Sequence, residues 1–358
     1  MNNTSADKSS HPRTPSPTLI QYHQDSFQGM MQEWLSSSRL PPVLLLTGQS
    51  GIGKREVIQF LAQWILCESR TPSEACGQCF SCQQFKLGNQ VNCVEILSES
   101  GEERGSLKIE QFRDLKTSIG LGTHGQHHKV ILIPHVECLT PQASNSLLKL
   151  LEEPPQGWIF LLTTFDSTLL LPTLVSRCQT LRLKPIREEV LVKILTEAHI
   201  ASDRRQICAR LAQGSLKRAL LLAQDEVWKQ RHLLVEFLKE PHHHLQTLIE
   251  WGTQKPQNFE ILIDLLEQLH SDLLSWAAST EENSSSLPMR EGLNTDLAQE
   301  LNQLALIQVQ RGGLQRARQF WIQQAERLAQ LRMELLAPLN RKVLIQDLLF
   351  SWLEAKNL

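Results

Sequence analysis

The chain has 358 residues, enough for about two or three domains. Hydrophobic residues make up 41% and charged residues 21%, which is ordinary for a soluble globular protein. The formal net charge of −2 gives no sign of an overall basic nucleic-acid binder, although a local basic patch is compatible with it, and no apolar run has membrane-spanning length.

The first residues, 1–18, are rich in Ser, Thr and Pro and contain no hydrophobic signal core. We therefore expect a disordered tail and a cytoplasmic protein. The cytoplasm is a reducing compartment. Because several of the eight cysteines are clustered, they suggest metal binding more than disulfides.

The next part of the chain alternates strand and helix patterns. A short helix is expected at 27–35, and further helices are expected at 54–67, 109–119 and 141–153. Continuous apolar runs predict strands at 43–46, 94–97, 130–133, 159–164 and 180–183. This order predicts an α/β fold with a parallel sheet that helices cover on both faces.

From Ile186 onward the strand signals stop and the pattern is helical, with a polar break at 279–294. The last helix is expected to carry one apolar stripe, made of Val343, Leu344, Leu348, Leu349 and Trp352. The predicted division is a tail (1–18), an α/β domain (19–184) with a cysteine-rich insertion (67–82), a small helical domain (185–225) and a larger helical domain (226–358).

A glycine-rich loop, Gly48 to Lys54, follows the first predicted strand and precedes a predicted helix. The Gly-x-x-x-x-Gly-Lys pattern makes a phosphate cradle, in which backbone N–H groups and a lysine face the ligand. The candidate phosphate-binding residues are Gly48, Gly51, Gly53 and Lys54. A chance glycine-rich turn is the alternative, and the flanking strand and helix argue against it.

Two departures remove the magnesium ligands that such a loop normally has. The residue after the lysine should carry a hydroxyl, but it is Arg55. The end of the third strand should carry acidic residues, but it has Pro134 and His135, while Glu137 lies further on. We therefore expect no Mg²⁺ site of the chain's own and no hydrolysis, which puts ATP binding itself in doubt.

Four cysteines follow the loop helix with the spacing Cys-x₈-Cys-x₂-Cys-x₂-Cys: Cys67, Cys76, Cys79 and Cys82. Four converging thiolates suit tetrahedral Zn²⁺ in a closed, structural site. Disulfides or free buried thiols are the alternatives.

These features together resemble the clamp-loader branch of the AAA+ family, as found in bacterial DNA polymerase III. The resemblance rests on the loop, on the four-cysteine insertion behind it and on three further segments: Asn145 to Pro155, Ser176-Arg177-Cys178 and Gly214 to Leu220. The motor subunits of these loaders, tau and gamma, keep the hydroxyl and the acidic residues. The departures at Arg55, Pro134 and His135 indicate a subunit that is not a motor.

The resemblance implies a subunit that is not an enzyme on its own but belongs to the DNA polymerase III holoenzyme. Its partners would be tau or gamma, the delta subunit, the sliding clamp and primer–template DNA, at the bacterial nucleoid during replication. The last helical domain would form an oligomeric collar. By itself Arg177 reads as a surface charge, but in the resembling family this position faces the adjacent subunit and implies an arginine finger.

Two other functions fit parts of the pattern. One is an active ATPase of the tau or gamma type that tolerates Arg55 and uses Glu137 as a substitute acid. The other is a zinc-dependent DNA-binding module, against which the lack of basic and aromatic residues around the cysteines argues.

Overall fold

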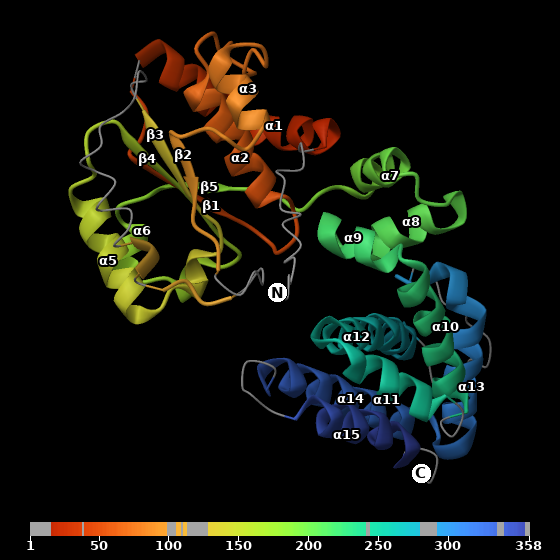
Figure 1. The fold of residues 1–358 in the computed structure, drawn as a ribbon. Helices are drawn as coiled ribbons and strands as arrows, with labels where there is room; N and C mark the ends of the chain where they lie inside the picture. Colours follow the sequence, from red (N-terminus) through yellow and green to blue (C-terminus); the bar gives the residue numbers. More distant parts are fainter. Residues whose placement is uncertain are drawn as a thin grey trace, which may run out of the picture. The chain divides into compact units, whose positions relative to one another are not determined.

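In the computed structural model the chain forms two compact units: residues 1–194 with 214–217, and residues 195–213 with 218–358. The structure describes residues 16–37, 39–98, 105–108, 110–112, 128–240, 244–279, 292–334 and 340–354. The first unit contains the sheet, and in the second the described elements are all helical (Figure 1). The predicted α/β class followed by helices is therefore confirmed.

The sheet of the first unit has five strands in the order β2-β3-β4-β1-β5. Every neighbouring pair of strands is parallel. The strands are β1 (Val43–Thr47), β2 (Cys93–Glu95), β3 (Lys129–Ile133), β4 (Trp158–Thr164) and β5 (Gln179–Arg182). Each overlaps a predicted strand, with ends that differ from the predicted ones by up to two residues. This parallel order brings the carboxyl ends of β1 and β3 to one edge of the sheet, where the phosphate loop begins.

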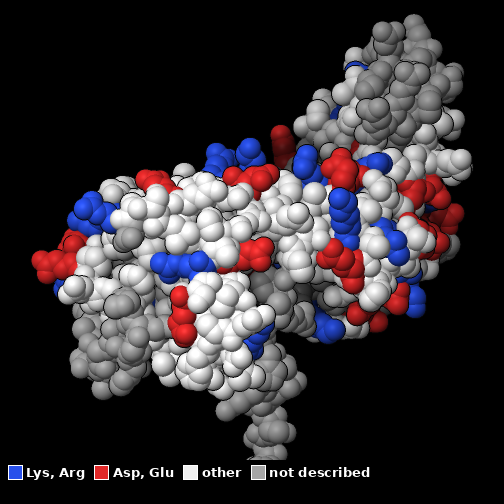
Figure 2. Space-filling model, turned by 90° about the horizontal axis from the view of Figure 1, so that it is seen from above, with Lys and Arg blue, Asp and Glu red and all other residues white. Residues whose placement is uncertain are grey.

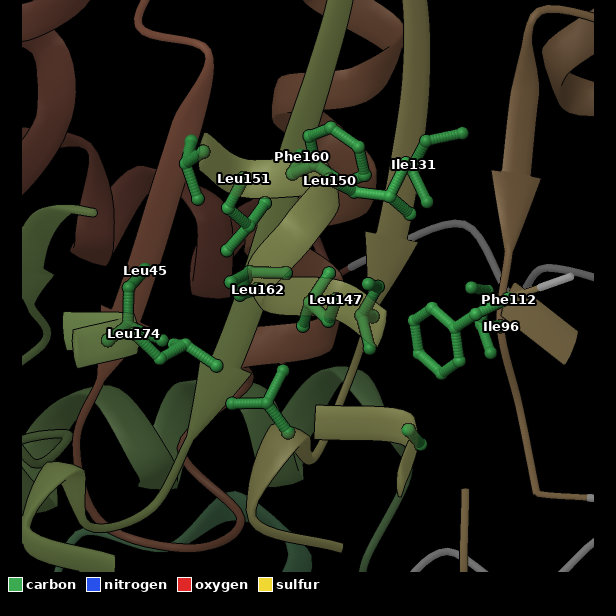
Figure 3. Packing of buried hydrophobic residues seen from close by; sticks show 14 of the residues in the cluster. Leu45, Ile96, Phe112, Ile131, Leu147, Leu150, Leu151, Phe160, Leu162 and Leu174 are labelled. Atoms are coloured by element: carbon green, nitrogen blue, oxygen red, sulfur yellow. The ribbon is translucent and has the colours of Figure 1, made fainter. Parts of the chain in front are cut away.

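Both faces of the sheet are covered because both sets of alternating strand residues are apolar. On one face Leu45, Ile131 and Phe160 pack with Leu147 and Leu151 of α5 (Pro141–Glu152), as Figure 3 shows. Residues of the opposite parity, such as Leu44 and Leu161, are also fully buried. Their face is covered by α2 (Lys54–Leu66), which contacts β1, β3 and β4.

The first helix is longer than its predicted range. Helix α1 spans Pro17–Ser37 and buries Leu19, His23, Phe27 and Trp34 along one stripe. The Ser- and Pro-rich composition concealed its beginning, since burial against the first unit decides where it starts. Positions 17 and 18 of the predicted tail thus belong to α1, and positions 1–15 lie outside the described residues. Of the helix predicted at 109–119, only positions 110–112 are described.

The remaining described elements of the first unit are short. They are α3 (Phe80–Lys86), η2 (Val136–Cys138), η3 (Ser167–Leu169) and α6 (Pro172–Val175). Helix α5 begins as predicted, with Thr140 accepting a hydrogen bond from the backbone N–H of Ala143 and Pro141 in the first turn. It ends at Glu152, before Pro154.

Helices α7 (Glu188–Glu197) and α9 (Leu216–Leu222) contain residues of both units. The second unit also contains α8 (Ser202–Leu211), α10 (Asp225–Lys239), α11 (Leu245–Gln254), α12 (Pro256–Ser279), η4 (Thr295–Leu297), α13 (Ala298–Gly312), α14 (Leu314–Glu334) and α15 (Arg341–Glu354). A buried polar cluster holds the chain before η4. Asp272 accepts hydrogen bonds from the backbone N–H groups of Leu293 and Asn294, and Arg231 donates to Asn294 and pairs with Asp296.

Charged side chains of both signs are interspersed on the part of the surface that Figure 2 describes. None of the described helices is long and apolar enough to cross a membrane.

Candidate functional sites

The phosphate loop joins β1 to α2 in the predicted place. Gly51 (φ 78°) and Gly53 (φ 92°) have left-handed backbones that favour glycine. A Cβ at Gly51 would lie 2.2 Å from Ser215 Oγ, and a Cβ at Gly53 would lie 2.6 Å from a methyl carbon of Leu19. Both glycines are therefore required by the chain's own packing as well as by backbone geometry.

The lysine of the loop bonds to the loop itself. Lys54 Nζ donates to the carbonyl oxygens of Gly48 (2.6 Å) and Gln49 (2.8 Å), and the residue is only 5% exposed. Elsewhere, the backbone N–H of Lys217 donates to Gly51 O, and a ring nitrogen of His23 lies 2.8 Å from Ile52 O. Burial lowers the pKa of His23 despite this hydrogen bond, so the ring is neutral at pH 7 and Nε2 carries the donated proton. Side chains and backbone of the first unit thus hold the loop in one conformation.

Arg55 stands where a hydroxyl would hold magnesium, and it forms a bidentate ion pair. Its Nε and Nη2 donate to the two carboxylate oxygens of Glu95, at 2.7 and 2.9 Å. Glu95 is the last residue of β2, the edge strand. The residue after the lysine is therefore a cation paired with a carboxylate, and its own side chain offers no oxygen to a metal.

The end of β3 lacks the acidic ligands in the same way. His135 has a left-handed backbone (φ 58°), and its N–H donates to Thr163 Oγ1. Its Nδ1 lies 3.2 Å from Oε1 of Glu137, whose side chain is 5% exposed. Burial acts to raise the pKa of Glu137, but the hydrogen bonds from His135 and the backbone together outweigh it and lower the pKa. Glu137 is therefore an ionised carboxylate that His135 already engages.

The four predicted cysteine ligands come together. The Sγ atoms of Cys67, Cys76, Cys79 and Cys82 all lie within 4.8 Å of one another. All four are free thiols. In a tetrahedral zinc site with Zn–S of about 2.3 Å, sulfur atoms would be about 3.8 Å apart, so this spacing fits with a small contraction.

Backbone N–H groups orient the sulfur atoms. The N–H groups of Cys76, Cys79 and Cys82 point at the sulfurs of Cys67, Cys76 and Cys79, at 3.2, 3.3 and 3.4 Å. Hydrogen bonds from the backbone of Gln78 and Cys79 lower the pKa of Cys76 to about 6. Burial raises the pKa of Cys67 and of Cys82 instead. The four converging sulfur atoms match the donor set of a structural metal site.

Arg177 lies between α6 and β5. Its side chain bonds to residues of neither the phosphate loop nor the cysteine cluster. Its Nη1 donates to Thr173 O at 2.8 Å and its Nη2 to Glu152 Oε1 at 2.9 Å. Its side chain remains 35% exposed.

Sequence reasoning missed two acidic partners, Glu95 of Arg55 and Glu152 of Arg177. The signals for them in the sequence were an acidic residue within a predicted strand and another near the end of a predicted helix.

Comparisons with known proteins identify the family of this chain. The profile of the family described as "DNA polymerase III, delta subunit" matches residues 23–187. The delta-prime subunit (delta′) of DNA polymerase III from Yersinia pestis is 30% identical over 333 residues, which cover 88% of this chain and 90% of that protein. The chain belongs to the DNA polymerase III delta-prime family.

Motor subunits also match, over a shorter range. The tau subunit of Escherichia coli is 36% identical over 199 residues, which cover 54% of this chain and 30% of tau. The matched region therefore spans only about a third of the length of the tau subunits that it matches. Among solved structures, a gamma subunit-related protein from Thermotoga maritima aligns with 93% of the chain at 17% identity and a TM-score of 0.44.

Proposed function

We propose that this delta-prime chain is a clamp-loader subunit that does not hydrolyse ATP and that supplies Arg177 to the ATP site of a neighbouring subunit. In this proposal it assembles with tau or gamma and with delta, at the bacterial nucleoid. The complex would load the sliding clamp onto primer–template DNA as part of the DNA polymerase III holoenzyme.

The observation that carries the proposal is the ion pair between Arg55 and Glu95. It occupies the position of one magnesium ligand, and Pro134 and His135 occupy the positions of the others. Mg²⁺ needs oxygen ligands, and catalysis of phosphoryl transfer needs Mg²⁺. A subunit without its own metal site can still act on a neighbour's ATP through an exposed arginine, which is always charged and donates paired hydrogen bonds.

The cysteine cluster and the last helices have supporting roles in this proposal. The cysteines would hold one structural Zn²⁺, because a closed set of four thiolates leaves no position for a substrate. Residues 19–184, 185–225 and 226–358 would be the three domains, and the last would form the collar. Apolar side chains exposed on α14 and α15 support the collar: Ile322, Val343 and Phe350.

An active ATPase of the tau or gamma type is the second candidate, since the match to tau favours it. ATP hydrolysis by the purified chain with Mg²⁺ separates the two. We expect no turnover above that of a buffer blank, whereas turnover of order ~1 per second or faster would establish the second candidate.

The arginine finger is tested in a complex reconstituted with Arg177→Ala. We expect the variant to assemble normally but to lower the ATPase activity that DNA and the clamp stimulate, together with clamp loading. Single arginine fingers contribute on the order of 10³–10⁵ in rate elsewhere, and one finger among several sites will show a smaller effect on total turnover. Arg177→Lys should rescue poorly, because a point charge lacks the fork. Unchanged activities with Arg177→Ala would disprove the finger.

A further inference from the structure

Two acceptors hold the guanidinium of Arg177. The turn after α6 is closed by the backbone N–H of Arg177, which donates to Leu174 O. The side chain then folds back, so that Nη1 reaches Thr173 O and Nη2 reaches the carboxylate of Glu152. A guanidinium has five N–H donors, and these two bonds leave three others for a phosphate.

Glu152 presents its carboxylate from a well-anchored element. It is the last residue of α5, whose beginning is fixed by the Thr140 cap. Leu147, Leu150 and Leu151 bury the helix against the sheet (Figure 3). The proline at position 154 prevents the helix from continuing past this residue. The acceptor is therefore placed by the core, although the carboxylate itself is half exposed.

We propose that Glu152 is a positioning residue for Arg177: it holds the guanidinium in the orientation that reaches the neighbouring subunit's ATP. This inference rests on the proposed function. An arginine side chain has many rotamers, and fixing them in advance raises the fraction that is ready when the subunits meet. Glu152 does not touch the reacting phosphate in this role.

The carboxylate could instead neutralise Arg177 and hold it away from the nucleotide. Three features favour positioning. The contact uses a single carboxylate oxygen on one nitrogen, the second anchor is a neutral carbonyl, and the side chain remains accessible. A guanidinium held only at these points keeps its charge and its remaining donors.

The expected size of the decrease in kcat follows from how exposed the side chains of Arg177 and Glu152 are. With side chains 35% and 50% exposed, the pair belongs to the weak surface class. Such pairs change an equilibrium by about 1.5- to 5-fold, and we expect a decrease in kcat of that size in the complex. This is far smaller than the loss expected from removing a finger.

The test uses the full complex, assembled with wild-type chain, Glu152→Ala, Glu152→Gln, Arg177→Ala, or Glu152→Ala combined with Arg177→Ala. The matched control is Glu153→Ala, which removes the adjacent exposed carboxylate. ATP turnover is measured with clamp and primed DNA, and kcat is separated from KM. The thermal midpoint of each free chain checks that it is folded.

We expect Glu152→Ala to lower kcat without raising KM, and Glu152→Gln to recover most of it, because an amide oxygen accepts the same hydrogen bond. In the Arg177→Ala background, Glu152→Ala should have no further effect on kcat, and Glu153→Ala alone should match wild type. A higher kcat with Glu152→Ala, equal losses with Gln and Ala, or a loss that persists without Arg177 would each overturn the inference. An unchanged kcat with Glu152→Ala would also overturn the inference, provided that Arg177→Ala lowers turnover. If Arg177→Ala leaves ATP turnover unchanged, the proposed arginine finger is overturned, and this inference with it.

Discussion

At the scale of single residues, the arginine at position 55 affects the chemistry of the phosphate loop more than it affects stability. Arg55 and Glu95 form a bidentate pair at the surface, worth about 1 kcal/mol or less. Its chemical effect is larger, because Arg55 replaces a metal-binding hydroxyl and donates to both carboxylate oxygens of Glu95. The loop keeps its conformation, since Lys54 donates to a carbonyl oxygen of the loop and the close packing at Gly51 and Gly53 leaves no room for a side chain.

We predict that Arg55→Thr does not create an ATPase. The threonine would restore one oxygen ligand, but Pro134 remains without a usable side chain and His135 remains engaged with Glu137. Phosphate release by the purified variant with Mg²⁺ should equal that of wild type. Turnover that rises to ordinary enzyme rates would show that Arg55 alone had disabled the site.

At the scale of elements, the four cysteines join α2, which covers one face of the sheet, to the short helix α3. Cys67 follows α2 directly, Cys79 caps α3 and Cys82 lies within α3. The cap is itself a sulfur interaction, since Cys79 Sγ accepts from the N–H of Cys82. A metal at their centre would fix the short helix α3, which at seven residues is too short to be stable alone.

We predict that Cys82→Ser lowers the zinc content of chain purified without chelator from about one per chain to near zero, since a closed site loses affinity steeply when it loses a thiolate. It should also lower the thermal midpoint of unfolding. Cys93→Ser, outside the cluster, is the control and should retain the metal. Metal analysis decides the question, and zinc-free wild-type chain would refute the assignment.

At the scale of the whole molecule, the second unit has a core of its own and an apolar surface besides. The buried cluster of Arg231, Asp272 and Asn294 lies entirely within it. Helix α15 buries Ile345, Leu348, Leu349 and Trp352 but exposes Val343 and Phe350. These two residues are seven positions apart and share one helix face.

We predict that Val343→Ser combined with Phe350→Ser weakens assembly with partner subunits about tenfold or more, because exposed apolar anchors dominate interface energies. The side chains are 55% and 45% exposed, so the thermal midpoint of the free chain should stay the same. Substituting the exposed Lys342 by Ser on the same helix is the control. Sedimentation of mixed subunits measures assembly, and undiminished assembly of the double variant would refute a collar contact at this face.

The sequence by itself determined the strands, the phosphate loop and the convergence of the four cysteines. Each of these depends on residues close together in the chain: continuous apolar runs, a Gly-x-x-x-x-Gly-Lys spacing and two Cys-x₂-Cys steps. Prolines and the Thr140 cap likewise fixed the limits of α5, because they act on the backbone next to them.

Only the tertiary structure decided which side chains meet across the fold. Arg55 and Glu95 are 40 positions apart, and Arg177 and Glu152 are 25 apart, so their contacts depend on strand order and on where α5 ends. The apolar stripe predicted on the last helix divides for the same reason, since Leu348 and Trp352 are buried whereas Val343 is exposed. Helix α15 is apolar on more than one side, and packing against α11 and α14 selects which face is buried. Local pattern specifies the elements, whereas long-range packing chooses their partners.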